Sequence, residues 1–181
     1  MSRRNASARR SSPHTENICG VDAAIVRIFN TFGPRMRLDD GRVIPTFVSQ
    51  ALKAQPITVH GDGMQTRSLC YVSDLVDGVV RMAKSAHPGP INIGNPRETT
   101  IIELARSVRD RCVSDSDIVL GPEKAEDPRR RMPDISLASS VLGWEPKTSF
   151  EDGLDLAIPW FSSRIAGTAA CTDAGAPGAG R

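Results

Sequence analysis

The chain has 181 residues, of which 39% are hydrophobic and 24% charged, and its formal net charge is +2. This length and composition are those of one ordinary soluble domain, or of a piece of a larger one. No apolar run reaches membrane-spanning length, and no apolar core follows the basic start as a secretory signal requires, so we expect a cytoplasmic protein without membrane contacts. No basic stripe with interleaved aromatic residues predicts nucleic-acid binding.

The two ends of the chain differ in composition from its middle. Residues 1–20 hold four arginines against one acidic residue and few apolar side chains, and we predict a disordered basic tail. Residues 162–181 are mostly small, and we predict a second flexible tail there. The folded part is then residues 21–161. The cysteines form no C-x-x-C pair, so neither a metal site nor a disulfide framework is predicted.

Strand and helix patterns alternate along the middle of the chain. The predicted strands are residues 22–29, 57–60, 68–72, 90–94 and 117–121. The predicted helices are residues 43–55, 73–85, 101–112, 135–143 and 149–161. Strands that alternate with helices indicate an α/β fold with a substantially parallel sheet.

Several helix ends and faces follow from single residues. Ser73 is a predicted N-cap, Thr100 and Glu103 have the spacing of a capping box, and Gly143 is a predicted helix stop. Pro159 lies inside the last helix and should kink or end it. For helix 73–85, the spacing of apolar residues predicts an inner face of Leu75, Val76, Val79, Val80 and Ala83.

The first predicted strand stops in the loop of "RIFNTFGPRM", residues 27–36. Loops at strand ends often carry ligand contacts in α/β proteins, because the sheet is rigid and the loop is free to vary. The simpler interpretation is a type I turn with Pro34 at its second position. These ten residues alone do not decide between the two.

Five segments occur in the order found in the extended short-chain dehydrogenase/reductase family. They are "RIFNTFGPRM", "DGRVIPTFVSQAL", "ITVHGDGMQTRSLCYVSDLVDGV", "INIGNPRETTIIELA" and "EDPRRRMPDISLASSVLGWEPKTSFEDGL". Residues 21–161 therefore resemble the C-terminal half of this NAD-dependent epimerase/dehydratase family, and within it most resemble UDP-glucuronic acid decarboxylases. Nucleotide-sugar 4,6-dehydratases and 4-epimerases are the alternative relatives. The resemblance implies the C-terminal part of a Rossmann-type parallel sheet plus a small substrate-binding subdomain.

Two features of the family are absent from the sequence. No glycine-rich turn of the G-x-x-G-x-x-G or G-x-G-x-x-G type follows a strand, and the residue four positions after Tyr71 is Leu75 in place of the lysine of a Y-x-x-x-K pair. The resemblance implies NAD as cofactor, but we expect no specific NAD binding by this chain alone and assign no catalytic residue. A truncated gene product or a misplaced start would explain the abrupt beginning of the resemblance near Gly20.

The resemblance also implies an activity and a set of contacts. The activity is the NAD-dependent conversion of UDP-glucuronate to UDP-xylose through a 4-keto intermediate, in an enzyme that is typically homodimeric. Arginine suits the diphosphate because its planar fork donates two hydrogen bonds at once. The implied substrate contacts are Asn30 at the diphosphate end, Arg35 near the sugar carboxylate, Thr58, Val59 and His60 beside the uracil, Arg67 on the diphosphate, and Arg131 and Asp134 near the phosphates and ribose.

Three hypotheses follow from the substrate-contact motifs that the sequence has and the cofactor and catalytic motifs that it lacks. The chain is an enzyme fragment that is inactive alone, a non-catalytic module that binds UDP-sugars, or an unstable remnant without a ligand. The sequence does not decide among them.

Overall fold

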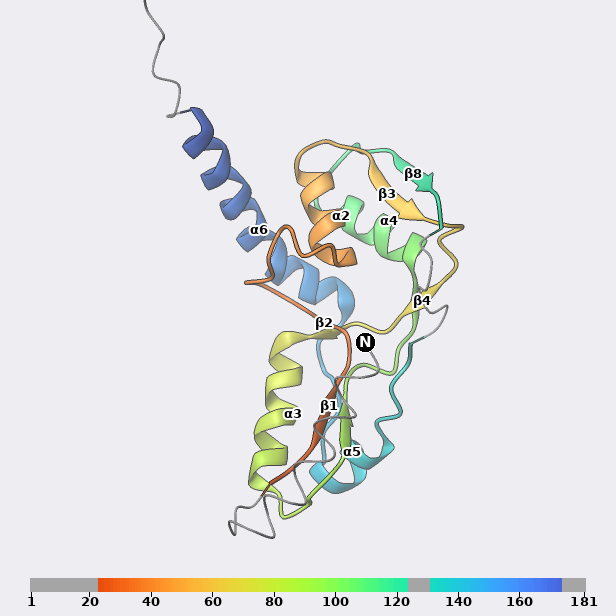
Figure 1. Cartoon of the computed structure of the whole chain (residues 1–181), viewed down its shortest axis with the longest axis vertical. Helices are drawn as coiled ribbons and strands as arrows, with labels where there is room; N and C mark the ends of the chain where they lie inside the picture. The colour runs from red at the N-terminus through yellow and green to blue at the C-terminus, as the bar shows by residue number, and fades with distance from the viewer. Residues whose placement is uncertain (1–22, 124–130, 174–181) are drawn as a thin grey trace, which may run out of the picture. The chain divides into compact units, whose positions relative to one another are not determined.

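The computed structural model describes residues 23–123 and 131–173 (Figure 1). The chain divides into two compact units and passes several times from one to the other. Unit 1 contains the residues up to Thr31, Ser68–Glu98 and Met132–Lys147. Unit 2 contains Phe32–Arg67, Thr99–Arg131 and the residues from Thr148 onward. The two-residue strand β2 (Thr31–Phe32) contains the first of these boundaries.

Unit 1 is built on a pair of parallel strands, β1 (Val26–Ile28) and β6 (Ile91–Ile93). Its other elements are the short strand β5 (Cys70–Tyr71), helix α3 (Val72–Lys84) and helix α5 (Ser136–Leu142). Both helices pack against the strand pair, α5 on the side of β6. One buried core cluster of the unit consists of Cys70, Met82, Ile91, Ile93, Ala138 and Trp144.

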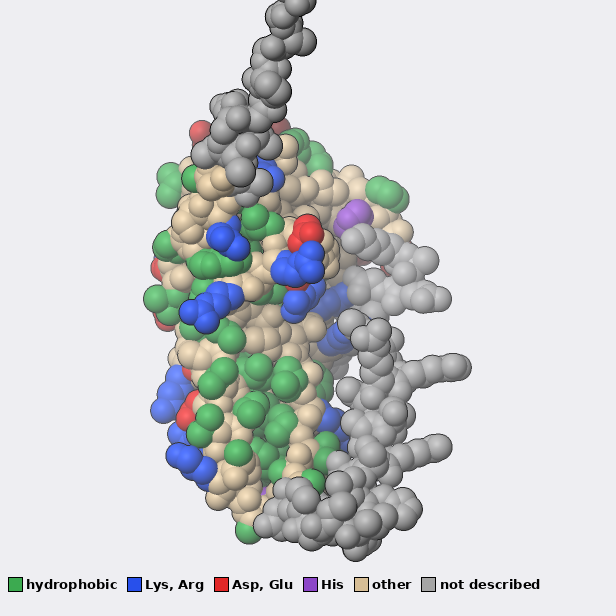
Figure 2. Space-filling view, turned by 60° about the vertical axis from the view of Figure 1, so that its left-hand side comes forward, with side chains coloured by type: hydrophobic (Ala, Val, Ile, Leu, Met, Phe, Trp, Pro, Cys, Tyr) green, Lys and Arg blue, Asp and Glu red, His purple; other side chains and the backbone are tan. Residues whose placement is uncertain are grey.

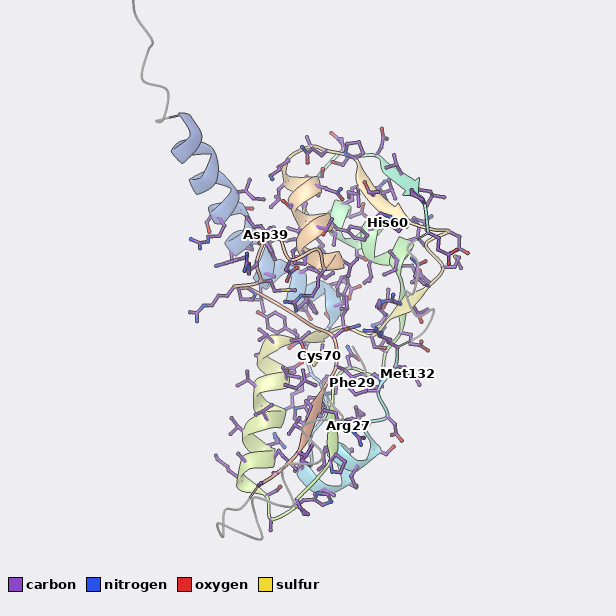
Figure 3. The ribbon with its side chains drawn as sticks, viewed as in Figure 1. Arg27, Phe29, Asp39, His60, Cys70 and Met132 are labelled. Atoms are coloured by element: carbon purple, nitrogen blue, oxygen red, sulfur yellow. The ribbon has the colours of Figure 1, made fainter. Side chains whose placement is uncertain are left out.

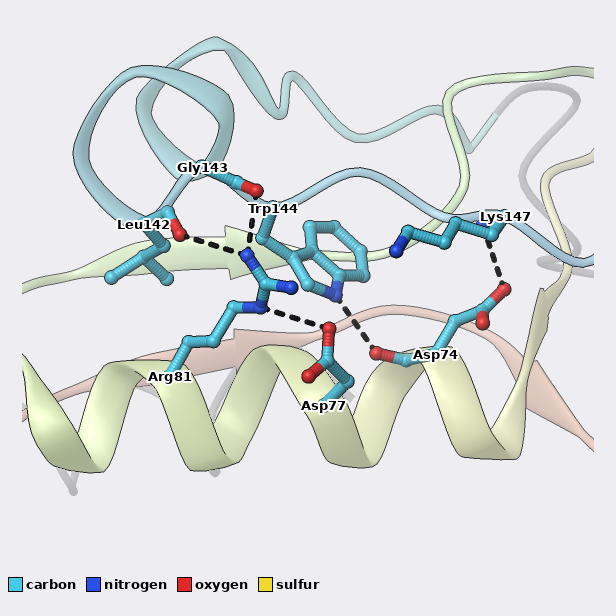
Figure 4. A network of polar contacts seen from close by, with 7 residues as sticks. All are labelled: Asp74, Asp77, Arg81, Leu142, Gly143, Trp144 and Lys147. Atoms are coloured by element: carbon cyan, nitrogen blue, oxygen red, sulfur yellow. Dashed lines mark hydrogen bonds and ion pairs between the residues drawn. The ribbon is translucent and has the colours of Figure 1, made fainter.

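A polar network fixes the end of α5 onto α3 (Figure 4). Gly143 ends α5 in the left-handed conformation, with φ of 57°. The Nη1 of Arg81, on α3, donates to the carbonyl oxygens of Leu142 and Gly143 at 3.3 and 2.7 Å, and its Nε donates to Asp77 at 2.9 Å. The arginine thus satisfies carbonyl groups that every helix C-terminus leaves unpaired.

Trp144 is almost fully buried directly after this helix stop. Its Nε1 donates to the carbonyl oxygen of Asp74 at 2.9 Å, which satisfies the polar atom of the ring (Figure 4). The ring lies against Gly78, where an added Cβ would stand 3.0 Å from Trp144 and 2.8 Å from Ile93. The glycine therefore permits the close approach of α3 to the indole and to β6.

The described residues of unit 2 form three helices and two pairs of strands. The helices are α2 (Val43–Leu52), α4 (Ile101–Arg111) and α6 (Phe150–Asp173). The strands are β3 (Ile57–His60), β4 (Thr66–Arg67), β7 (Thr99–Thr100) and β8 (Ile118–Gly121), with β3 parallel to β8 and β4 antiparallel to β7. The three helices pack on one another around buried side chains, including Phe47, Val48, Leu104, Val108, Leu154 and Phe161.

The α/β class, the parallel pairing and several local features are confirmed. Thr100 and Glu103 form the complete capping box at the start of α4, and Gly143 ends α5. The predicted cap at Ser73 is wrong, because α3 begins one residue earlier and its N-cap residue is Tyr71.

The predicted inner face of α3 is confirmed at Leu75, which packs against the core of the unit, and is wrong at its valines. Val76, Val79 and Val80 are 53%, 36% and 43% exposed, whereas Gly78 and Met82 are buried. Apolar spacing favours the valine-rich side, but the helix turns the side without a Cβ toward Trp144 because only a glycine fits there. The helix therefore presents valines to solvent.

Two further expectations differ from the structure. Helix α6 does not end at Pro159 but continues to Asp173, so residues 162–173, assigned above to a flexible tail, are helical. Arg35 has φ of 69°, and a positive φ directly after Pro34 excludes a type I turn and fits the third position of a type II turn. The predicted tails at residues 1–20 and 174–181 lie outside the described residues.

Candidate functional site

The clearest binding feature is the edge of β3 that faces away from β8. The backbone amides of Ile57 and Gly61 donate to carbonyl oxygens of the segment that carries β8, at 2.7 and 2.9 Å. Peptide groups alternate in direction along a strand, so those of Thr58 and His60 point to the opposite edge. Figure 3 shows His60 at the end of this strand. Val59 is fully buried and points its side chain into the core.

Two glutamines occupy the ends of this edge. The Gln50 side chain accepts from the Thr58 amide at 3.1 Å and donates to the Thr58 hydroxyl at 3.3 Å. Gln65 donates to the carbonyl oxygen of His60 at 2.7 Å. The Thr58 carbonyl and the His60 amide lie between these two glutamine contacts. Neither group has a hydrogen-bond partner among the described residues. In a parallel ladder these are the two groups that pair with a single residue of the next strand.

An acceptor and a donor at ladder spacing suit the edge of a planar ring that offers one donor and one acceptor. The imidazole of His60 is already engaged, because its Nδ1 lies 3.1 Å from the carbonyl oxygen of Pro122. The recognition available here is therefore by the backbone. Gln50 and Gln65 were not predicted from the sequence, since their role depends on contacts between α2, β3 and the following turn.

A glycine turn leads from β3 to Arg67. Gly61 and Gly63 both have positive φ, at 71° and 73°, which glycine adopts without strain. An added Cβ on Gly63 would stand 2.9 Å from Val59, so the turn folds tightly over the strand. Arg67 then pairs with Thr99 across β4 and β7.

Arg67 is 8% exposed, and its Nη1 donates to the carbonyl oxygen of Thr66 at 2.7 Å. Burial and this hydrogen bond hold the planar guanidinium group of Arg67 in place. Such a fixed cation is suited to a phosphate group, which accepts two of its donors at once.

Arg35 and Arg131, the other two predicted arginines of unit 2, are exposed. Arg35 has the uncommon positive φ described above, a conformation that often marks binding loops. The structure thus joins the predicted residues of β3 to the segment of Arg67 through Gln65, whereas among the described residues no hydrogen bond or ion pair joins Arg35 or Arg131 to them.

Asn30 and Asp134 belong to unit 1. The carbonyl oxygen of Asn30 accepts from the Cys70 amide at 2.9 Å. The Asp134 carboxylate accepts from the Ser136 hydroxyl and amide at 2.7 and 2.9 Å, and these hydrogen bonds lower the pKa of that carboxyl. Asp134 is therefore ionised at neutral pH and is positioned at the start of α5.

The described residues do not fit NAD. A dinucleotide needs a glycine-rich turn that leads from a strand directly into a helix, whose N-terminus receives the pyrophosphate. The glycine turn of Gly61 and Gly63 leads into strand β4, and β5 passes into α3 at Tyr71 without a glycine. In residues 23–123 and 131–173 no strand-to-helix turn has the required glycines.

The described residues offer no second site that includes the predicted residues. A surface hollow of about 570 Å³ lies at the C-terminal ends of α2 and α4 and contains none of the predicted residues. No group of three or more His, Cys, Asp or Glu residues could hold a metal ion in this part of the chain. None of the described helices is both long and apolar enough to cross a membrane.

Comparisons with known proteins give a consistent family. Residues 12–94 match the sequence model of the NAD dependent epimerase/dehydratase family. UDP-glucuronic acid decarboxylase 2 of Arabidopsis thaliana is 50% identical over 147 residues, and UDP-glucuronic acid decarboxylase 1 of Danio rerio is 47% identical over 146 residues. Each alignment covers 81% of this chain but only 33% and 35% of those relatives.

Solved structures agree with the fold. UDP-glucose 4-epimerase of Thermotoga maritima, solved with UDP-glucose, matches with a TM-score of 0.83 and 27% identity, over 88% of this chain and 52% of that one. A mutant UDP-glucuronic acid 4-epimerase of Bacillus cereus, solved with UDP-4-deoxy-4-fluoro-glucuronic acid and NAD, matches with a TM-score of 0.78 and 25% identity, over 88% and 51%. The chain spans about half of these proteins.

Proposed function

We propose that this chain, which belongs to the NAD dependent epimerase/dehydratase family, is the nucleotide-sugar-binding part of a relative of UDP-glucuronic acid decarboxylase. The coverage of a third of the decarboxylases means that their activity is not transferred to this chain as it stands. The chain binds a UDP-sugar and does not decarboxylate it without a cofactor-binding half.

The observation that carries this proposal is the edge of β3. The Thr58 carbonyl accepts from the N3–H of uracil while the His60 amide donates to a neighbouring uracil carbonyl, because these two groups are the unpaired acceptor and donor of that edge. Gln50 and Gln65 saturate the groups on either side, which leaves one register for the base.

Arg67 supplies the charge for the diphosphate. It follows β3 by one tight turn in the same unit, and burial limits its motion. Arg35 and Arg131 are further arginines of that unit for the phosphates and the sugar carboxylate, as the family resemblance implies. Asn30 and Asp134 remain predicted substrate contacts from unit 1.

Amide chemical-shift mapping with UDP tests the base contact. The His60 amide should move on titration, and UDP methylated at N3 should bind at least about tenfold more weakly, because it lacks the donor for Thr58. Absence of any UDP-dependent shift at millimolar ligand would overturn the binding proposal. Equal affinity for the two ligands would reject the β3 edge but keep the family assignment.

Replacement of Arg67 tests the diphosphate contact. Arg67→Ala should cost about 1.5 to 3 kcal/mol of UDP binding, the range for hydrogen bonds to charged groups. Arg106→Ala, on the exposed side of α4 in the same unit, is the matched control and should leave the affinity unchanged. A similar loss in both variants would point to general electrostatic attraction instead of a specific contact.

A direct assay tests the absence of catalysis. The chain with UDP-glucuronate and NAD should release no carbon dioxide, because its described residues do not fit NAD and the sequence has no Y-x-x-x-K pair. Release at the rate of a full-length decarboxylase would overturn this part of the proposal. Epimerisation or dehydration of other UDP-sugars, measured in parallel, tests the alternative relatives.

A further inference from the structure

A surface hollow of about 570 Å³ lies outside the proposed nucleotide site, at the C-terminal ends of α2 and α4. All of its lining residues belong to unit 2, and its volume is that of a small-molecule pocket. The exposed valines of α3 form an apolar patch (Figure 2), whereas the hollow combines apolar, acidic and hydroxyl side chains. A mixed lining of this kind suits a ligand that has both a charge and an apolar part.

The backbone makes the surroundings of the hollow negative. A helix C-terminus carries about half an elementary negative charge, and the C-termini of α2 and α4 both border the hollow. The carbonyl oxygens of Leu52 and Cys112, two lining residues, accept from no donor among the described residues. Lys53 is exposed and is not a lining residue, and none of the described residues that line the hollow is basic. The backbone therefore favours a cation here.

Two aspartates add full charges to this negative end. Asp115 and Asp117 line the hollow and are exposed, and neither carboxylate has a hydrogen bond or ion pair with a described residue. The two arginines in the last turn of α4, Arg109 and Arg111, are each paired with another aspartate. The charge of the hollow is therefore not neutralised by the helix that borders it.

A chain of hydroxyl groups gives the hollow a buried acceptor. The Ser114 hydroxyl donates to the carbonyl oxygen of Ala51 at 2.9 Å, and it lies 2.9 Å from the Ser116 hydroxyl. Because the Ser114 proton is used on Ala51, Ser116 is the donor of that second pair. Ser116 is 7% exposed and lines the hollow, and its oxygen accepts from no donor among the described residues. A ligand with several donors would supply the missing partner.

The chain leaves both helices in an unusual conformation beside the hollow. Ala54 and Val113 have φ of 51° and 50°, in the left-handed region that glycine usually occupies after a helix. A β-branched residue rarely adopts this conformation, and such residues occur most often at ligand contacts. The side chain of Val113 is also 92% exposed, which leaves apolar surface at the rim of the hollow.

We propose that the hollow binds a small organic cation, with one or two primary ammonium groups on a short aliphatic stem. An ammonium group has three donors and no acceptor, which matches the acceptors Asp115, Asp117 and Ser116. The aliphatic stem lies against Leu52 and Val113. A metal ion fits less well, because no group of three or more His, Cys, Asp or Glu among the described residues could hold one.

Amide chemical-shift mapping of the full chain tests the proposal. Butane-1,4-diamine should shift the amides of Val113, Ser114 and Asp115 in a saturable way. Butyrate and 1-butanol have a similar stem without the positive charge, and should bind at least about threefold more weakly. The same ammonium chemistry occurs in a free amine and in a lysine side chain of a protein. Tighter binding of Nα-acetyl-lysine amide than of the diamine would assign the lysine, and the reverse would assign the free amine.

Replacement of the carboxylates tests the assigned residues. The double variant Asp115→Asn, Asp117→Asn should bind the diamine at least about threefold more weakly, with its circular dichroism spectrum unchanged. Glu123→Gln removes an exposed carboxylate from the same segment, outside the lining of the hollow, and should leave the affinity unchanged. No lining residue is a predicted UDP contact, so failure of this proposal and failure of the UDP proposal are distinguishable.

Absence of a saturable shift at these amides up to about 50 mM diamine would overturn the proposal, since weaker binding is not specific. Equal affinity for 1-butanol would also reject it, because the hollow would then recognise only the stem. Unchanged affinity in the double variant would mean that the diamine binds elsewhere. Tighter binding of calcium ions than of the diamine would identify a metal site and would likewise reject the organic cation.

Discussion

The approach of α3 to Trp144 predicts opposite effects for two glycine-to-alanine changes. Gly78→Ala places a Cβ 2.8 Å from the Cγ2 of Ile93 and 3.0 Å from the indole of Trp144, and both side chains are buried. Gly167→Ala, in α6, places a Cβ that meets nothing within 4 Å. Both glycines lie in helices, so both changes bring the same gain in helix propensity. The difference in stability between the two variants therefore measures the cost of packing at Gly78.

The magnitudes follow from these distances. Replacement of a helical glycine by alanine gains about 1 kcal/mol. Overpacking of a buried site costs about 1 to 3 kcal/mol, and the rigid indole ring puts Gly78 near the upper end of that range. Gly78→Ala should therefore lower the free energy of unfolding by about 1 to 2 kcal/mol, whereas Gly167→Ala should raise it by up to about 1 kcal/mol.

Urea denaturation followed by Trp fluorescence and circular dichroism measures both variants. The transition midpoint should fall for Gly78→Ala and rise or stay for Gly167→Ala, with unchanged slopes. A Gly78→Ala variant as stable as Gly167→Ala would refute the close approach of α3 to the indole. The fit of Gly78 against Trp144 would then no longer explain why the valines of α3 are exposed.

Three further predictions concern local contacts. Arg81→Met should lower stability by about 1 kcal/mol, because the carbonyl oxygens of Leu142 and Gly143 lose their donor, and an unchanged urea midpoint would contradict the network. Thr100→Ala should cost about 1 kcal/mol through loss of the capping box of α4, with Thr99→Ala as the neighbouring control. Burial raises the pKa of Cys70 to about 12 and that of Cys112 to about 11, whereas an unfolded thiol titrates near about 8.5. The folded state holds protons that the unfolded chain releases, so stability should be full below about pH 8.5 and fall as the pH rises toward 11. A Cys70→Ala, Cys112→Ala double variant measured by urea denaturation should show a flatter alkaline decline, and an identical decline would reject this cause.

The sequence predicts those parts of the fold that depend on neighbouring residues. The capping box at Thr100, the stop at Gly143 and the strand at β3 are local patterns, and all three occur in the structure. The orientation of α3 could not be predicted, because it depends on a fit between Gly78 and Trp144, which are far apart in the chain. A pattern of apolar positions places the valines on the inner face. It does not show that a glycine, which has no side chain, lies there instead.

The candidate site shows the same division. The sequence could point to the segment of β3 and Arg67 because a motif preserves their order along the chain, and their contacts with a substrate stay a prediction. The part played by Gln50 could not, since its side chain reaches Thr58 only after α2 packs against β3. Pro159 failed as a helix end because proline removes one hydrogen bond, while the packing of α6 on α2 and α4 holds the rest of that helix.

Among the described residues, the outer edges of β3 and β1 differ in what surrounds them. At β3, glutamine side chains occupy the outer peptide groups and leave a single acceptor and donor, so a longer strand has too few partners to pair there. At β1, which pairs with β6 alone in this part of the chain, no glutamine plays the same part. Backbone groups alone would allow a strand at either edge, so the two glutamines are what make the edge of β3 suited to one planar ring.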